Sequence, residues 1–495
     1  MTHPPIIIIG AGIGGMSAAI HLAAAGKSVR IVEQNPAAGG KMGQVQAAGF
    51  RWDTGPSVIT MRPVLEDLFT VAHRNLTDYL TLLPIDPLTR YVYPDGTRLN
   101  IQRTLSETLA QIEALSPADV EGYLRYLAYA AGLYRVAAPS FVFGPPPGLS
   151  SLSSVPLRDY PKIDPLRTMQ QAIDGFVRHP HLRQLLGRFA TYVGASPYLA
   201  PATLNVIAHV ELNGGVWYPQ GGVYALAQAY QQLAQELGVE FQFNAQVKQI
   251  LVEDGAAKGI VLVSGEVLPA AAVLANVDVA TVYEHLLPPQ VLPARKVRRH
   301  IRRAPSCSGF VLLLGVRGEH PQLAHHNIFF SRDYRQEFAQ IFEQRIPPTE
   351  PTLYLAITSK TDAQHAPANH ENWFILVNVP ADDGSLDWRT FAPQYRDQIL
   401  AQLAQFGLDV RQNIVVEQHI TPSDLARLTG ARGGALYGAS SNDRFAAFLR
   451  PHNREKDLKG LYYCGGTTHP GGGVPMVTRS GKLAAQMILE DARDK

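Results

Sequence analysis

Near its N-terminus the chain reads Pro5-Ile6-Ile7-Ile8-Ile9-Gly10-Ala11-Gly12-Ile13-Gly14-Gly15-Met16. The four isoleucines are typical of a strand that is buried on both faces of a parallel sheet. Gly10, Gly12 and Gly15 have the G-x-G-x-x-G spacing. The first allows a tight turn, the second lets the backbone approach a pyrophosphate, and the third lets a helix pack closely. The stretch predicts a βαβ unit that binds a dinucleotide.

The residues that follow support this interpretation. Residues 17–25 are rich in alanine and predict a helix, and residues 29–33 predict the second strand. Glu33 ends that strand 18 positions after Gly15, where an acidic side chain binds a ribose hydroxyl. A glycine turn without any ligand is the alternative, but the strand, helix and acid around the glycines favour a nucleotide site.

Composition limits the class of protein. The chain has 495 residues, of which 46% are hydrophobic and 17% charged, with a net charge of +2. Nucleic-acid binders usually carry a basic excess, so no nucleic acid is expected as a partner. The low charge suggests a large apolar cavity or extra apolar surface. The two cysteines form no metal motif, and no apolar run reaches the length of a membrane span. The nucleotide strand leaves no room for a signal peptide, and we expect a cytoplasmic protein.

A second glycine pair follows the first unit at Gly39-Gly40-Lys41, and a polar loop follows at residues 49–56. An NAD site has no obvious use for this pair. FAD is longer and needs more close backbone approaches, and Lys41 could offset pyrophosphate charge. A solvated surface lysine is the alternative for Lys41.

Two later segments return to the nucleotide domain. Residues 214–278 contain a glycine pair, a helix and short strands, which predict a return to the first sheet. Residues 460–477 predict a short strand that runs into a glycine-rich loop, and residues 478–491 predict a closing helix. Such a loop brings backbone N–H groups and a helix N-terminus to a phosphate or a polar ring.

Three intervening features suggest a second part of the molecule. Residues 134–148 are apolar, aromatic and broken by prolines, which suggests a membrane-dipping segment or substrate gate, or else a loop packed under its own domain. Residues 295–303 carry six cationic side chains, which suggests attraction to anionic lipids, or else a solvated helix face. Strand-like stretches at 308–316, 352–358 and 373–379 predict a second, mixed or antiparallel sheet.

The sequence resembles the bacterial-type flavin-dependent carotenoid (phytoene) desaturases over essentially its whole length. Within the C-terminal block, Val474-Pro475-Met476 looks more like the 1-hydroxycarotenoid 3,4-desaturase branch. The matching motifs are Gly10-Ala11-Gly12-Ile13-Gly14-Gly15, Glu33, Gly39-Gly40-Lys41, Asp53-Thr54-Gly55-Pro56-Ser57, Tyr218-Pro219-Gln220-Gly221-Gly222, residues 326–331, Thr361-Asp362, Ala366-Pro367 and residues 465–475.

This resemblance implies an α/β fold with a discontinuous Rossmann-like FAD-binding domain, formed by residues 1–100, 210–290 and 420–495. Residues 100–210 and 290–420 would form the substrate-binding and membrane-docking parts, with a mixed sheet and a helical membrane-associated region. It also implies a peripheral membrane protein. The implied contacts to FAD are Gly10, Gly12, Gly15, Glu33, Gly40, Lys41, Gly55, Val247 on the adenine side, Gly466 and Val474.

The implied activity is desaturation of a long polyene carotenoid, with quinone or oxygen as the electron acceptor. The sequence shows no metal cluster and no nucleophile motif, so a bound flavin carries the redox chemistry. Hydride would leave an allylic carbon, and a proton would leave the adjacent carbon. His469, in the last glycine loop, is the candidate base. The alternative is a histidine that only shapes the loop through hydrogen bonds.

Other activities stay open. A flavin-dependent carotenoid isomerase, or an oxidase or ketolase, would share these motifs. A non-catalytic prenyl-binding protein of the same fold, of the Rab-escort type, is a further alternative, but the intact glycine triplet and Glu33 argue against it. An amine oxidase usually shows an aromatic cage where this chain has His469-Pro470-Gly471.

Overall fold

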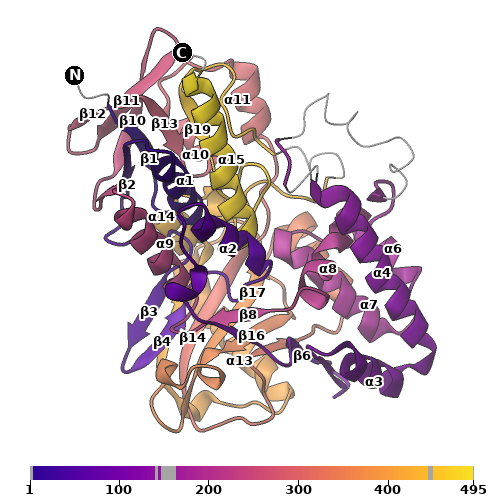
Figure 1. Ribbon diagram of the computed structural model, residues 1–495. Coiled ribbons are helices and arrows are strands. Elements are labelled where there is room, and N and C mark those ends of the chain that lie inside the picture. The colour runs from indigo at the N-terminus through magenta and orange to yellow at the C-terminus, as the bar shows by residue number, and fades with distance from the viewer. Residues whose placement is uncertain (1–3, 140–142, 147–162, 444–449, 494–495) are drawn as a thin grey trace.

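A five-stranded parallel sheet lies at one end of the molecule (Figure 1). The computed structural model describes residues 4–139, 143–146, 163–443 and 450–493. The predicted parallel sheet is confirmed, and its strands come from distant parts of the chain. In spatial order they are β19 (Leu461–Tyr463), β13 (Ala272–Ala275), β1 (Ile6–Ile9), β2 (Val29–Val32) and β9 (Glu240–Gln242).

Both faces of this sheet are covered, which explains the unbroken isoleucine run. Ile6 and Ile8 pack in the core beneath the helices, whereas Ile7 and Ile9 pack in the core beneath a second, antiparallel sheet. Successive side chains of a strand point to opposite faces, so both faces must be apolar. The covering helices are α1 (Ile13–Ala24), α9 (Tyr224–Glu236) and α15 (Val474–Arg493), and the covering strands are β10 (Val247–Glu253), β11 (Ala256–Leu262) and β12 (Val267–Pro269).

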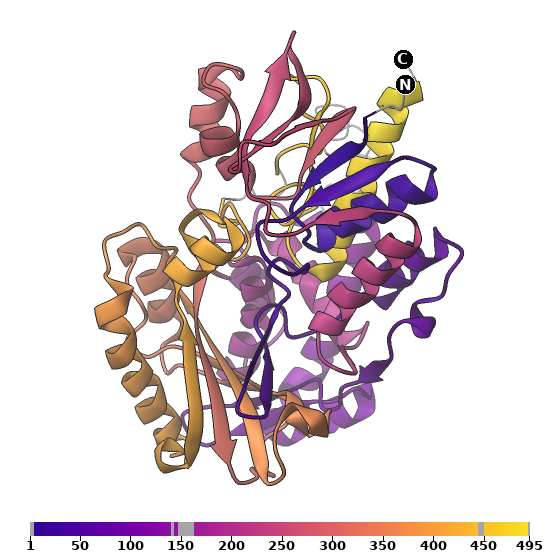
Figure 2. The ribbon, with the colours of Figure 1, turned by 90° about the vertical axis from the view of Figure 1, so that its left-hand side faces the viewer.

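A seven-stranded mixed sheet forms the second part, as the strand-like stretches predicted (Figure 2). Helix α13 (Trp388–Gln405) packs on one of its faces, and the hairpin of β3 (Gln44–Ala47) and β4 (Phe50–Asp53) packs on the other. In spatial order the strands are β18 (Ile414–Ile420), β14 (Ser308–Arg317), β17 (His370–Val379), β16 (Leu353–Ile357), β15 (His326–Phe329), β6 (Thr89–Val92) and β7 (Arg98–Ile101).

Strands β6 and β7 lie in this second sheet, although the sequence analysis assigned residues 1–100 to the FAD-binding domain. Strand β6 pairs in parallel with β15, and β7 pairs with β6. A local pattern predicts a strand but not its partner, and parallel partners are joined only by long connections. The chain therefore crosses to the second part earlier than residue 100.

Helices fill the space beside both sheets. Residues 169–193 do not form one continuous helix, because Pro180 lacks an amide hydrogen and begins a new helix instead of continuing the old one. The remaining elements are α2 (Arg62–Thr70), α3 (Leu105–Leu115), α4 (Val120–Ala137), α6 (Met169–Asp174), α7 (Pro180–Gly187), α8 (Val206–Leu212), α10 (Val279–Thr281), α11 (Ala294–Ile301), α12 (Tyr334–Ala339), α14 (Pro422–Thr429), β5 (Leu82–Pro84) and β8 (Trp217–Pro219).

Of the apolar segment 134–148, residues 140–142 and 147–148 lie outside the described residues. Among the helices of the described chain, none is both long enough and apolar enough to cross a bilayer.

Candidate active site

The glycine loop leads from β1 into an uncapped helix. Gly10 has φ of +95°, which a side chain rarely tolerates, and its turn points the chain into α1. The N-terminus of α1 has no side-chain cap and no acidic residue in its first turn. Its first N–H groups are therefore available for an anion. A Cβ atom on Gly12 would lie 2.8 Å from Nδ2 of Asn276, so a side chain has no room here.

Glu33 lies beside this loop at the carboxyl end of β2. Its carboxylate accepts hydrogen bonds from the N–H of Ala11 at 2.7 Å and from the N–H of Asn35 at 2.9 Å. The side chain is 6% exposed, so these contacts fix its position. A carboxylate accepts about four hydrogen bonds, which leaves capacity for a ribose hydroxyl.

The second glycine pair lies against the first. Gly39 forms a parallel bridge with Gly12, and a Cβ on Gly40 would lie 3.2 Å from the Cα of Gly12. Gly55 packs on the same turn, since its Cβ would lie 2.0 Å from the Lys41 carbonyl oxygen. The sequence therefore predicted a second close backbone approach where the structure has one.

Lys41 is accessible to solvent but is not a free surface lysine. Its Nζ donates to the carbonyl oxygens of Ala435 at 3.1 Å and Leu436 at 2.8 Å. Desolvation by the surrounding chain lowers the pKa of Lys41 to about 8, and Asp278 partly opposes this. The lysine thus joins the glycine pair to the segment that precedes the last strand.

The last glycine loop meets the first at Asn276. A Cβ on Gly14 would lie 3.2 Å from the Cα of Gly465, so the two backbones touch. Asn276 Nδ2 donates to the Gly10 carbonyl at 3.2 Å. The sequence analysis gave Asn276 no role. Its signal was its place as the first polar residue after a buried strand parallel to β1, at the edge where ligands bind.

The other predicted residues of this region lie around the same loops. Val474 is the first residue of α15 and is buried. Gly466 follows Gly465 in the turn that leads toward α15. Val247 begins β10, and two residues earlier the Ala245 N–H donates to the Glu33 carbonyl at 2.8 Å. Val247 therefore lies on the Glu33 side of the glycine loop.

His469 is enclosed by the loop that carries it. The side chain is 2% exposed, and its Nε2 donates to the carbonyl oxygen of Gly144 at 3.0 Å. Its own carbonyl accepts from Asn453 Nδ2 at 3.1 Å and from Ser480 Oγ at 2.7 Å. Burial lowers the pKa of His469 to about 4. These contacts favour the alternative in which His469 shapes the loop.

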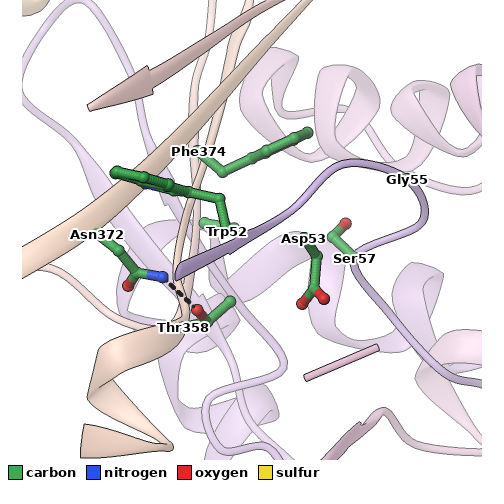
Figure 3. Close-up of a pocket in the computed structure, with 8 residues that line it drawn as sticks. Trp52, Asp53, Gly55, Ser57, Thr358, Asn372 and Phe374 are labelled. Carbon is green, nitrogen blue, oxygen red and sulfur yellow. Dashed lines mark hydrogen bonds between the residues drawn. The ribbon is translucent and has the colours of Figure 1, made fainter. Parts of the chain in front are cut away.

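A pocket lies where β4 and the loop after it meet the second sheet (Figure 3). Trp52, Ala356 and Phe374 form its apolar wall, and Asp53, Gly55, Ser57, Thr358 and Asn372 complete it. Asp53 accepts from Arg51 at 2.8 Å and from the Tyr218 hydroxyl at 2.6 Å. The sequence analysis quoted Asp53 within a motif but gave it no role, because its partner Tyr218 comes from a distant segment.

Three buried histidines lie behind this pocket, namely His325, His326 and His365. Each Nδ1 contacts a hydroxyl group, at distances of 2.6, 2.8 and 2.9 Å. Each Nε2 is buried and makes no hydrogen bond within the described part of the chain, although Nε2 of His365 lies 3.5 Å from a carboxylate oxygen of Asp362. Burial lowers the pKa of His325 to about 3 and lowers the pKa of His326 and of His365. The Arg51 guanidinium adds to the effect on the pKa of His365, whereas Asp362 and Asp53 oppose it.

These histidines predict acid sensitivity. The unfolded chain binds a proton on His325 below about pH 6.5 and the folded chain only near pH 3. The free energy of unfolding should therefore fall as the pH falls through this window, by about 1.4 kcal/mol per pH unit for His325. When the free energy of unfolding is measured with urea at several pH values between 7 and 5, it should change less with pH in His325→Gln than in the wild-type protein. The exposed His285→Gln serves as the control, and an unchanged slope in His325→Gln would contradict this assignment.

The residues present fit FAD. The uncapped N-terminus of α1 suits the pyrophosphate, and Glu33 suits the ribose. The close approaches at Gly12 and Gly40 leave no room for a Cβ. The fold and the site together define an FAD-dependent flavoprotein, as the sequence predicted.

The comparisons with known proteins identify the family. The model of the family "Flavin containing amine oxidoreductase" matches residues 13–489, and the chain belongs to this family. The chain is 38% identical to a 4,4'-diapolycopene oxygenase of Methylomonas sp over 98% of both chains. It is 36% identical to a 4,4'-diaponeurosporene oxygenase of Staphylococcus aureus, over 98% of this chain and 97% of the relative.

Solved structures show the same fold at low identity. An oxidoreductase from Methanosarcina mazei matches 98% of this chain and all of its own chain, with a TM-score of 0.66 and 17% identity. A putrescine oxidase bound to putrescine matches 99% of both chains, with a TM-score of 0.65 and 15% identity. These two likenesses concern the fold alone.

Proposed function

We propose that this chain is an FAD-dependent enzyme that oxygenates a long acyclic polyene of the diapocarotenoid type. The observation that carries the proposal is the full-length identity of 36–38% to two enzymes named as oxygenases of such polyenes. The intact glycine loop and Glu33 support a bound cofactor rather than a non-catalytic prenyl-binding protein. Desaturation is the second candidate, because the block at residues 465–475 resembles desaturases.

In this proposal, one set of residues binds the dinucleotide and another forms the apolar wall of the pocket. The amides of α1, with Glu33 and Lys41, hold the dinucleotide, and FAD when bound supplies the two-electron chemistry. Trp52 and Phe374 give the pocket beside Gly55 an apolar wall that excludes water. A polyene has almost no polar handle, so burial of its surface, at about 25 cal/mol per Å², must supply its affinity.

Such a substrate dissolves in bilayers, so we also propose that the enzyme works at a membrane surface. Helix α11 supports this, since Arg295, Arg298 and Arg299 are exposed on it. Lys296 is instead paired with Glu455 and Asp457. Basic side chains near an anionic leaflet contribute about 1 kcal/mol each.

The test is an assay of the flavin-loaded protein with 4,4'-diapolycopene or 4,4'-diaponeurosporene in vesicles, under dioxygen labelled with heavy oxygen. The proposal expects a product that carries labelled oxygen. A product lighter by two hydrogens identifies a desaturase, and an unchanged mass with a new double-bond geometry identifies an isomerase. Vesicles with and without anionic lipid, used in the same assay, test the role of α11.

Two controls make the assay decisive. Substitution Gly12→Ala, which should remove the flavin, must abolish the product if the reaction depends on FAD. Replacing dioxygen with a quinone under anaerobic conditions should stop oxygenation, because dioxygen supplies the oxygen atom, whereas a desaturase that reduces the quinone would still form product. Labelled product that persists without bound flavin would contradict the proposed function.

A further inference from the structure

Two side chains near the C-terminus, those of His469 and Arg479, donate hydrogen bonds to the stretch of residues 143–146. The Phe143 carbonyl accepts a hydrogen bond from Arg479 of α15. The Gly144 carbonyl accepts from Nε2 of His469 at 3.0 Å. The partners are separated by more than 300 positions in the chain, so these contacts are purely tertiary. This stretch, called the strap below, follows α4 and lies against the nucleotide-binding part.

The strap has a fixed geometry at its other end too. The Phe143 N–H donates to the carbonyl of Ala138 at 2.8 Å, just after α4. The Phe143 and Tyr134 rings pack edge to face, with their centroids 6.5 Å apart. The Arg479 guanidinium lies 5.7 Å from the centre of the Phe143 ring, within the range of a cation–π contact. The strap therefore joins the helical part to α15.

The chemistry of both donors suits a clamp. A carbonyl oxygen only accepts, so His469 must carry its hydrogen on Nε2. Arg479 uses one nitrogen on the strap, while its buried Nε has no partner among the described residues. The guanidinium is half-buried, and this desolvation lowers the pKa of Arg479, which the Asp67 carboxylate partly opposes. The Phe143 carbonyl oxygen and the Phe143 ring both contact this guanidinium.

The clamp is continuous with the cofactor loops. The Ser480 hydroxyl donates to the His469 carbonyl at 2.7 Å, and the Gly465 N–H donates to the same hydroxyl at 3.1 Å. Gly465 in turn touches Gly14 in the first turn of α1. A chain of direct contacts therefore links the strap to the glycine-rich N-terminal turn of α1.

We propose that His469 and Arg479 are positioning residues that clamp the strap across the last glycine loop. In this proposal His469 serves the reaction through its Nε2–H contact with Gly144, and it accepts no proton from the substrate. The kinetic part rests on the proposed function, whereas the clamp itself does not.

The matched pair His469→Gln and His469→Ala tests the role of His469. Glutamine can place an amide N–H near the position of Nε2, but it is not a base at neutral pH. The alanine variant should raise the KM for the polyene about 5- to 30-fold with kcat nearly unchanged, as for a lost buried hydrogen bond. The glutamine variant should restore most of the loss. Equal loss of kcat in both variants would overturn the proposal and restore His469 as the base.

A variant of Arg479, the second clamp residue, provides an independent test. Arg479→Met removes the other contact without touching any candidate base, and it should raise the KM in the same way. In the double variant with His469→Ala, the increase in the free energy that corresponds to KM should be smaller than the sum of the two single increases, since both residues act on one strap. Fully additive losses would contradict a shared clamp.

Hydrogen exchange of the flavin-loaded protein tests the clamp without any substrate. The Phe143 amide should exchange faster in His469→Ala and Arg479→Met, and at the normal rate in His469→Gln. Arg427→Met changes an exposed arginine and serves as the control. Unchanged exchange in the alanine variant would overturn the clamp, whereas failure of the polyene assay alone would count only against the proposed function.

Discussion

Gly12→Ala is expected to yield a folded protein that is nearly free of flavin. The Cβ atom would lie 2.8 Å from Asn276 Nδ2 and 3.9 Å from the Cα of Gly40, in the space through which the pyrophosphate approaches the backbone. We expect affinity for FAD to fall at least about tenfold, which corresponds to about 1.4 kcal/mol. Flavin absorbance per protein after purification, followed by titration with FAD, measures the effect.

Gly132 provides the matched control for this substitution. It lies within α4, and a Cβ atom built on it has no atom of the described residues within 4 Å. Gly132→Ala should keep its full flavin content and gain up to about 1 kcal/mol of stability, because alanine is the better helix former. Equal flavin content in the two variants would show that the loop after β1 does not contact the dinucleotide.

Arg188→Met is expected to destabilise the folded protein by about 3–5 kcal/mol. Arg188 and Glu211 are 6% and 2% exposed and form a buried ion pair. Arg188 also donates to the Tyr91 hydroxyl at 2.7 Å. Its loss leaves the Glu211 carboxylate buried without its cation, which costs far more than the loss of packing. Urea unfolding at neutral pH measures the change.

Two companion variants show whether the uncompensated charge is the cause. The double variant Arg188→Met with Glu211→Leu removes both charges and should recover much of the lost stability. The exposed pair of Arg411 and Asp409 is the surface control, because Arg411→Met should change stability by less than about 1 kcal/mol. Equal losses at the buried and exposed pairs would contradict the buried-charge explanation.

The glycine turn and the acidic residue beside it were predictable because their signals are local. Gly12 and Glu33 lie within one βαβ unit, where spacing along the chain fixes spacing in space. Asn276 and Asp53 were not assigned roles, because each acts through partners from other segments. No periodicity or spacing encodes such a partner. The same holds for strands β6 and β7, whose place in the second sheet is set by the pairing of β6 with β15.

The amino-acid sequence by itself determined the nucleotide strand, its glycine turn and the acidic residue that follows, because short-range sterics and side-chain alternation leave few alternatives for Ile6–Gly15. It also indicated that segments far along the chain return to this sheet. Only the tertiary structure decided what His469 touches. Its contact with Gly144 joins residues that lie 325 positions apart. Such a contact exists only after the helical and nucleotide-binding parts have packed together.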